Sequence, residues 1–280
     1  MLINRKYTLL ICLILLQVGC TLRNVQVFET SSKTLKPQNN TFFYENDSIK
    51  IVYDFWNQYG LIKFEVFNKT NKPLYIDWKK SSYISNKFKL NYYRDGETIE
   101  SKSLNANYYF KPNYTPNEIV MGATSSIVTK EERITFIPPK SKFTKSQFYI
   151  LPVNRFALPL STSFYETERN DNSSKKTIIY LQNYIEENSP SAFRNFLTLS
   201  FDESFKSEFY IDNDFYVDMV KEIDIKHFEI DKPYINQYGI KETAVDENGN
   251  QVKFSPFYSP IRFYIYLPDN VGFRRKVSIF

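Results

Sequence analysis

The stretch from Leu61 to Trp78, LIKFEVFNKTNKPLYIDW, constrains the fold of this chain more than any other. Apolar and polar residues alternate in both of its halves, which is the period of a half-buried β-strand. Between the halves, Asn68–Pro73 holds two Asn, two Lys, a Thr and a Pro, residues that favour turns. The stretch therefore predicts a β-hairpin with one apolar face. Such a hairpin needs a second sheet to cover that face.

Further short segments alternate in the same way, and no segment of ten or more residues keeps a helical period. Asp95-Gly96 predicts a type I′ hairpin turn, and Pro138-Pro139 predicts a strand that stops at a sheet edge or at a corner between sheets. This spacing of strands and turns predicts an all-β, antiparallel sandwich. The other predicted strands are Asn24–Phe28, Ile49–Trp56, Phe88–Tyr92, Glu97–Lys102, Arg133–Ile137, Phe148–Leu151, Thr177–Ile185, Phe193–Phe201, Phe209–Val220, Ile223–Ile230 and Ile261–Leu267.

The length of 280 residues allows one large sandwich or two small domains. We expect a signal peptide over 1–19 and a polar tether over 20–41 that lifts the domain off a membrane. Residues 42–160 are then a sandwich part, and 161–176 form a polar loop or a seam between subdomains. Residues 177–280 supply the remaining strands, in the same unit or in a second small β subdomain.

The N-terminus has the layout of a secretory signal. Arg5 and Lys6 precede the apolar run Leu9–Leu16, which is too short to span a bilayer. Gly19 then stands directly before Cys20. The segment from Leu16 to Cys20 resembles the lipobox of bacterial lipoproteins, although Gln17 stands where that motif usually has Leu.

The lipobox resemblance implies that Cys20 is acylated and becomes the mature N-terminus. The chain would then be held at the membrane by its N-terminal lipid, which includes palmitate. Cys12 would be removed with the signal, so the mature chain would hold no free thiol and no disulfide. An ordinary cleaved signal or an uncleaved anchor, each with Cys20 as a free thiol, is the alternative.

Composition excludes some classes of function. The hydrophobic content of 42% and the aromatic content of 18% argue against disorder. The net charge is +5, or +3 without Arg5 and Lys6, and the lysines are scattered, so we expect no nucleic-acid partner. The seven glycines form no phosphate-binding pattern, so we expect no nucleotide cofactor.

The chain offers little for catalysis or for metal binding. His227 is the single histidine and lies in a predicted strand, so a Ser-His-Asp triad and a structural zinc site lack partners. We expect no metal site. Asp212 and Asp214 come closest to a hard-cation pair, whereas the segment after Asp246 departs from a calcium loop at Gln251 and Phe257.

Two tryptophans are candidates for a ligand-facing surface. Trp56 and Trp78 could stack on sugar rings, or they could belong to the core, with Asp77 beside Trp78 paired to Lys79 or Lys80. Asp47-Ser48-Ile49 resembles the O-glycan acceptor motif of Bacteroidota, which makes Ser48 a candidate for glycosylation.

Three further segments carry a family resemblance. Pro73–Trp78 and the later Ile137–Ser141 resemble Ig-like sandwich modules of uncharacterised secreted lipoproteins, and Phe193–Thr198 resembles lipoproteins of the Bacteroidota type. The resemblance implies an Ig-like β-sandwich and a place in the cell envelope. By analogy with better-known lipoproteins, Thr21 in place of Asp after Cys20 gives no signal for retention at the inner membrane, so we expect the outer membrane, with the facing side left open. It lends no activity, so no functional residue is transferred. We therefore expect a non-catalytic module that binds or scaffolds an envelope protein, or alternatively a glycan-binding or glycan-processing lipoprotein.

Overall fold

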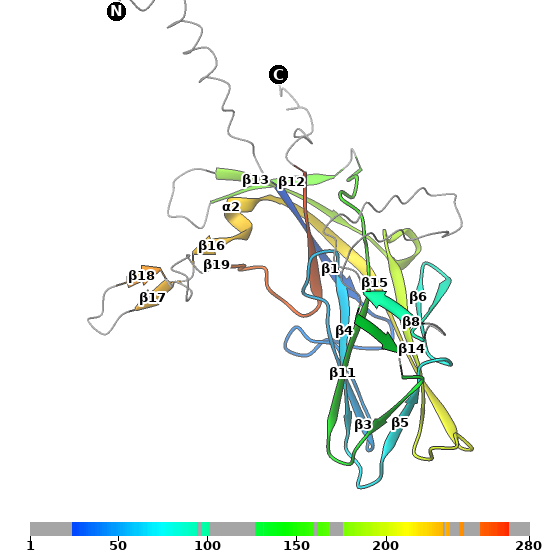
Figure 1. Ribbon diagram of the computed structural model, residues 1–280. Helices are drawn as coiled ribbons and strands as arrows, with labels where there is room; N and C mark the ends of the chain where they lie inside the picture. Colours follow the sequence, from blue (N-terminus) through cyan, green and yellow to red (C-terminus); the bar gives the residue numbers. More distant parts are fainter. Residues whose placement is uncertain are drawn as a thin grey trace, which may run out of the picture.

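The computed structural model describes residues 24–93, 97–100, 127–130, 132–159, 162–168, 176–231, 233–235, 241–243 and 253–268. These residues form antiparallel sheets with very little helix, as Figure 1 shows, which confirms the all-β prediction. The larger sheet has ten strands and the smaller has four.

The larger sheet has a central path in the order β10-β5-β14-β15-β1-β20, to which β6, β7, β12 and β13 add. Its strands are β1 (Asn24–Ser31), β5 (Leu74–Asp77), β6 (Ser82–Ser85), β7 (Phe88–Asn91), β10 (Ile134–Ile137), β12 (Ser163–Glu168), β13 (Lys176–Asn183), β14 (Ala192–Ser200), β15 (Glu208–Asp224) and β20 (Arg262–Tyr266).

The smaller sheet has the order β11-β4-β3-β2. Its strands are β2 (Phe43–Glu45), β3 (Ile49–Asp54), β4 (Leu61–Asn68) and β11 (Lys142–Tyr149). Two-stranded ribbons pair β8 (Glu97–Glu100) with β9 (Ile127–Lys130), β16 (Ile230–Asp231) with β19 (Lys253–Phe254), and β17 (Pro233–Ile235) with β18 (Lys241–Thr243). A 3-10 turn spans Glu186–Asn188, and the one-turn helix α2 spans Ile225–Phe228.

The main core lies between the two sheets, where aromatic rings from both sheets meet. Tyr53 of β3 lies 4.9 Å from Phe215 of β15, measured between ring centroids, and both rings are buried. This core draws on residues from both 42–160 and 177–280, and strands from both ranges share the larger sheet. The two ranges therefore build one sandwich.

Alternation correctly predicted which side chains of several strands face inward. Ile49, Ile51 and Tyr53 are fully buried on β3, and Phe263 and Ile265 are fully buried on β20. The Pro138-Pro139 prediction is also confirmed, because β10 before it belongs to the larger sheet and β11 after it to the smaller.

The turn before β4 depends on a glycine. Tyr59 and Gly60 both have positive φ, of 66° and 71°. A Cβ added to Gly60 would lie 2.8 Å from Phe263 Cγ, so a larger residue has no room there. This loop joins β3 to β4, which pair in antiparallel fashion.

The hairpin predicted over Leu61–Trp78 is wrong, although both of its strands exist. β4 pairs with β3 and β11 in the smaller sheet, whereas β5 pairs with β10 and β14 in the larger one. The turn after Asn68 therefore crosses between the sheets. Buried Asn68 holds this crossing, because its Nδ2 donates to the carbonyls of Lys72 and Ile137.

The predicted strand Asn24–Phe28 is confirmed as part of β1, whereas the polar tether predicted over 20–41 is not found over its described part. Residues from Asn24 onward form β1, which lies between β15 and β20 and buries both of its faces. Leu35 is buried as well. Polar side chains of β1 are buried because they form hydrogen bonds with neighbouring groups. Gln26 Nε2, for example, donates to Glu222 Oε2 at 3.0 Å and to the Phe156 carbonyl at 2.7 Å.

Other differences concern local structure. Ser163–Glu168 of the predicted polar loop is strand β12, and Phe209–Val220 lies within one 17-residue strand, β15, with no interruption at Asn213. The segment predicted as a strand over Ile223–Ile230 contains α2. The Asp95-Gly96 turn lies outside the described residues, and β8 after it pairs with β9. The tight turn of this region is Asn86-Lys87, with φ of 47° and 74°, between β6 and β7.

Candidate functional site

The outer face of β10, β5, β14 and β15 carries four aromatic side chains, which we call the aromatic face: Phe136, Tyr75, Phe196 and Tyr210. Each neighbours an inward residue on its strand, so the two-residue period turns it away from the core. Phe136 is 53% exposed and Tyr210 is 55% exposed.

Strand register brings these rings together in two pairs. Phe136 is the direct partner of Tyr75, with ring centroids 5.6 Å apart. Phe196 and Tyr210 stack at 5.4 Å. Between the pairs, β14 contributes the small side chains of Thr198 and Ser200, which are both buried.

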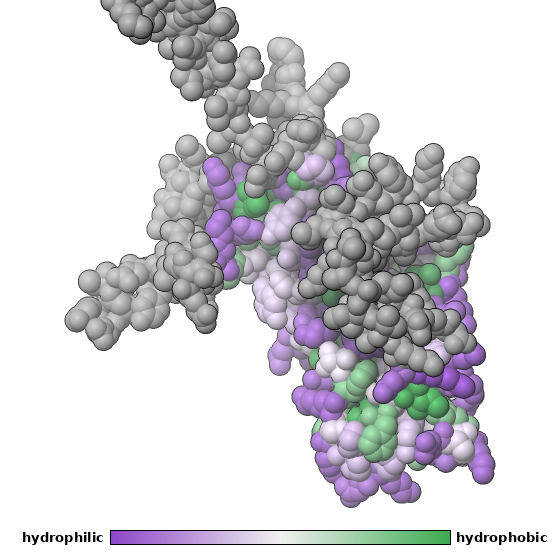
Figure 2. Space-filling model, in the orientation of Figure 1, coloured by the Kyte–Doolittle hydropathy of each residue, from purple (hydrophilic) through white to green (hydrophobic). Residues whose placement is uncertain are grey.

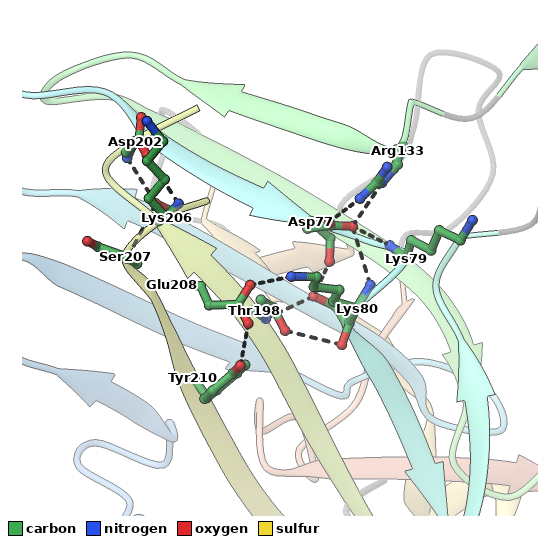
Figure 3. A network of polar contacts seen from close by, with 12 residues as sticks. Asp77, Lys79, Lys80, Arg133, Thr198, Asp202, Lys206, Ser207, Glu208 and Tyr210 are labelled. Atoms are coloured by element: carbon green, nitrogen blue, oxygen red, sulfur yellow. Dashed lines mark hydrogen bonds and ion pairs between the residues drawn. The ribbon is translucent and has the colours of Figure 1, made fainter. Parts of the chain in front are cut away.

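A buried carboxylate supports one edge of the aromatic face. Asp77 is only 1% exposed, and Arg133 Nη2 donates to its Oδ2 at 2.9 Å (Figure 3). The N–H of Lys79 donates to Asp77 Oδ1 at 2.9 Å. Asp77 therefore pairs with Arg133 rather than with the side chain of Lys79 or Lys80, and it ties the end of β5 to the start of β10.

A second polar group fixes Tyr210. Lys80 Nζ and the Tyr210 hydroxyl donate to different oxygens of Glu208, the tyrosine at 2.5 Å (Figure 3). These two hydrogen bonds lower the pKa of Glu208, and the one from Lys80 has the larger effect. The same contact with Glu208 raises the pKa of Lys80 and of Tyr210. Glu208 thus stays ionised and orients the exposed ring.

The remaining charges beside the aromatic face are compensated in the same manner. Arg194 Nε donates to Asp212 Oδ1 at 3.1 Å, and its Nη2 bonds the second oxygen. Asp214 accepts the N–H groups of Lys33 and Thr34 and the Thr34 hydroxyl. This face therefore combines exposed rings with charges that are already paired. Figure 2 shows apolar surface bounded by hydrophilic surface on the lower part of the sandwich.

The two tryptophans singled out from the sequence do not lie on this face. Trp78 is 2% exposed, and its Nε1 donates to Thr135 Oγ1 at 2.7 Å, so it belongs to the core between the sheets. Trp56 is partly buried in a second, smaller apolar cluster, where it contacts Phe228 and Tyr264. The structure does not bring Trp56 and Trp78 together.

The acidic pair singled out for a cation also has other partners. Asp212 and Asp214 flank buried Asn213 on β15, but Asp212 binds Arg194 and Asp214 binds the Ser32–Thr34 segment. Among the described residues, no three His, Cys, Asp or Glu side chains gather in a way that could hold a metal ion.

Three other candidates have the following positions. His227 is 7% exposed on α2, and its ring lies 5.6 Å from that of Phe257. Ser48 is partly exposed in the turn between β2 and β3, where its N–H donates to Asn46 Oδ1 at 2.9 Å. Cys20 and the segment Asp246–Gln251 lie outside the described residues.

One end of the sandwich holds an open cavity of about 670 Å³. Its described lining residues are Asn24, Tyr59, Asn154, Ile225, Glu229, Tyr266, Leu267 and Pro268. Asn24 Oδ1 is buried and accepts no hydrogen bond from the described residues. Glu229 accepts a hydrogen bond of 2.5 Å from the Tyr266 hydroxyl.

Comparisons with known proteins add nothing to the description of these sites. Searches of protein-family models, of curated proteins and of solved structures find no match for the chain. Within the described part of the chain, no helix has the length and apolar character that a membrane crossing requires. The sequence contains one signal for the aromatic face, because Tyr75, Phe196 and Tyr210 occupy polar positions of alternating strands. Strand register is needed to show that their rings share one face.

Proposed function

We propose that this chain is a lipid-anchored, non-catalytic binding or scaffolding module of the bacterial cell envelope. The lipobox-like segment ending at Cys20 supports the anchor and the outer-membrane address. The partner is another envelope protein, and it binds the aromatic face.

The observation that carries this proposal is the exposure of Phe136 and Tyr210 on one regular sheet face. Clustered exposed rings mark interaction surfaces on proteins, since they lose contact with water when a partner binds. Tyr is also enriched among residues that dominate binding energy. The paired charges around the rings require no free counter-charge from the partner.

Photo-crosslinking in living cells tests the surface. We would place a benzophenone amino acid at Tyr210 and, in a separate strain, at Lys63 on the outer face of the smaller sheet, whose side chain is 55% exposed. We expect a discrete covalent adduct from position 210 that disappears in a Phe136→Ser background. Equal adducts from both positions, or none from position 210, would contradict the proposal.

The anchor has its own test. Wild-type cells should incorporate labelled palmitate into the protein, and the Cys20→Ser variant should not. If that variant partitions into detergent like the wild type, the lipid anchor is wrong.

Glycan binding is the second candidate, and one observation favours it. Phe136 and Tyr210 are both more than half exposed on the same face of the larger sheet, and exposed rings can stack on sugars as well as on protein side chains. A glycan array probed with the mature protein separates the two: a clear hit that Phe136→Ser and Tyr210→Ser abolish would place glycan binding first.

A further inference from the structure

The start of β1 lies very close in sequence to the proposed lipid anchor. Asn24 is 7% exposed and pairs with Asp224, and its carbonyl accepts a hydrogen bond of 2.9 Å from the Leu267 N–H. The described part of the sandwich begins at residue 24, four residues after Cys20. No long polar spacer separates the two.

Covalent geometry limits the distance between them. Four residues span at most about 14 Å when fully extended. The headgroup layer on each side of a bilayer is roughly 5–7 Å thick, the difference between the total and the hydrocarbon thickness shared over two sides. An acylated Cys20 thus brings the first residue of β1 to the height of the headgroups or just above them.

We propose that the end of the sandwich formed by Asn24, Ile225, Lys226, Leu267 and Pro268 lies on the bilayer surface; we call it the membrane-proximal end. This inference rests on the proposed acylation of Cys20. The start of β1, the end of β20 and α2 occupy the same end of the molecule in Figure 1, so they approach the bilayer together.

The chemistry of this end suits a headgroup layer. Lys226 and Pro268 are exposed, and Tyr59 and Tyr266 line the cavity there. Tyrosine is enriched at membrane interfaces, where its ring and hydroxyl meet different environments. Asn24 and Glu229 also line this cavity, and the Glu229 carboxylate accepts the hydrogen bond from Tyr266 there.

The sequence after Pro268 contains three basic residues in a row. Arg274, Arg275 and Lys276 come six to eight residues after Pro268, among Phe273, Val277 and Ile279. Basic residues near a membrane are attracted by anionic lipids. The preferred partner is therefore a bilayer that contains anionic lipid.

This orientation also places the aromatic face. β15 runs from Glu208, beside the aromatic face, to Asp224 at the membrane-proximal end. Fourteen residues separate Tyr210 from Asp224, which corresponds to roughly 45 Å along a strand. The aromatic face is thus held well above the bilayer, where a partner can reach it.

Spin labels at the two ends test the orientation. The mature acylated chain has no other thiol, so Pro268→Cys and Asn71→Cys each give one label; Asn71 is exposed in the connection between β4 and β5, at the lower end in Figure 1. In vesicles of phosphatidylethanolamine and phosphatidylglycerol, we expect a water-soluble nickel chelate to reach the label at 268 several-fold less than that at 71. In detergent the two should differ much less.

The outcomes separate this inference from the proposed function. Equal access of the chelate to both labels, in protein that carries palmitate and floats with the vesicles, would overturn the orientation alone. Absence of palmitate would overturn the anchor. As a matched control, ten Gly and Ser residues inserted before Asn24 add reach of about 35 Å. The insertion should raise access at 268 to the level at 71; unchanged low access would show that spacing does not hold the end down.

Discussion

The two outer faces of the sandwich arise from the same alternation, yet they differ in what they present to water. The smaller sheet presents cross-strand charges: Lys142 Nζ lies 2.8 Å from Glu65 Oε1, and Lys63 lies 3.7 Å from Asp54. The larger sheet presents Phe136 and Tyr210, each more than half exposed.

The contrast shows that rings on the larger sheet are not a requirement of the fold. Across the outer face of the smaller sheet, Lys side chains pair with Glu and Asp, and Tyr149 of β11 is 39% exposed, less than Phe136 or Tyr210. Single exposed apolar residues are common on proteins, but clusters of them on one face indicate binding. The difference supports the proposal that the outer face of the larger sheet binds a partner.

The largest loss of stability should come from a substitution in the core between the two sheets. Phe64 is 1% exposed and packs near Tyr53 and Tyr92, so Phe64→Ala should lower the free energy of unfolding by about 3–5 kcal/mol. The matched variant Phe136→Ala should lower it by less than about 1 kcal/mol. Urea denaturation of both measures the difference; a similar loss in the two would mean that the exposed ring is structural.

A smaller loss of stability should follow from the removal of one hydrogen bond beneath the aromatic face. Thr135→Val removes the acceptor of the buried Trp78 Nε1–H and should cost about 1–3 kcal/mol. Thr135→Ser keeps the hydroxyl and serves as the control. Denaturation followed by tryptophan fluorescence reports on this site directly, and equal stability of the two variants would show that the bond contributes little.

Low pH should weaken the contact between Asp214 of β15 and the segment Ser32–Thr34 after β1. Burial raises the pKa of Asp214, but hydrogen bonds from Thr34, Ser32 and the Lys33 N–H outweigh it, so the pKa lies below its usual value of 3.8. A lowered folded pKa stabilises the protein above the unfolded pKa, and this stability is lost as pH falls through the folded value. Between about pH 5 and about pH 3, Asp214→Asn should lose less stability than the wild type. An equal loss would assign acid sensitivity to other groups.

The smallest effect should come from the charged face itself. A double-mutant cycle on Lys142 and Glu65, with Gln at both positions, should yield a coupling energy of less than about 1 kcal/mol, because exposed ion pairs are screened by water and salt. The coupling should shrink further in high salt. A coupling of several kcal/mol would mean that this face stabilises the fold as well.

How much of this could be predicted from the sequence depends on what alternation encodes. A period of two tells which side chains of β3, β4 and β20 face inward, and the structure agrees. It does not tell which strands pair, because β4 and β5 have suitable faces whether they join one sheet or two. Pro138-Pro139 predicted a corner through a backbone constraint; Asn68–Pro73 is a corner of the same kind but resembles a hairpin turn.

Other features depend on contacts distant in sequence. The strand β1 contains Asn24 and Gln26, and polar residues of this kind are buried only because Glu222 and Phe156 complete their hydrogen bonds. Nothing near β1 in the sequence reveals those partners. The aromatic face was not predicted for a similar reason, since Phe136 and Tyr210 are 74 residues apart and share one sheet face only because β5 and β14 lie between their strands.

The position of β1 between β15 and β20 also has a consequence for how the molecule is made. The first strand of the chain finds its neighbours about two hundred residues later, at Asp224 and Tyr266. A nascent polypeptide that has not yet reached those residues leaves the backbone groups of β1 without their sheet. During synthesis from the N-terminus, β1 therefore cannot take its place in the larger sheet until nearly the whole chain has been made.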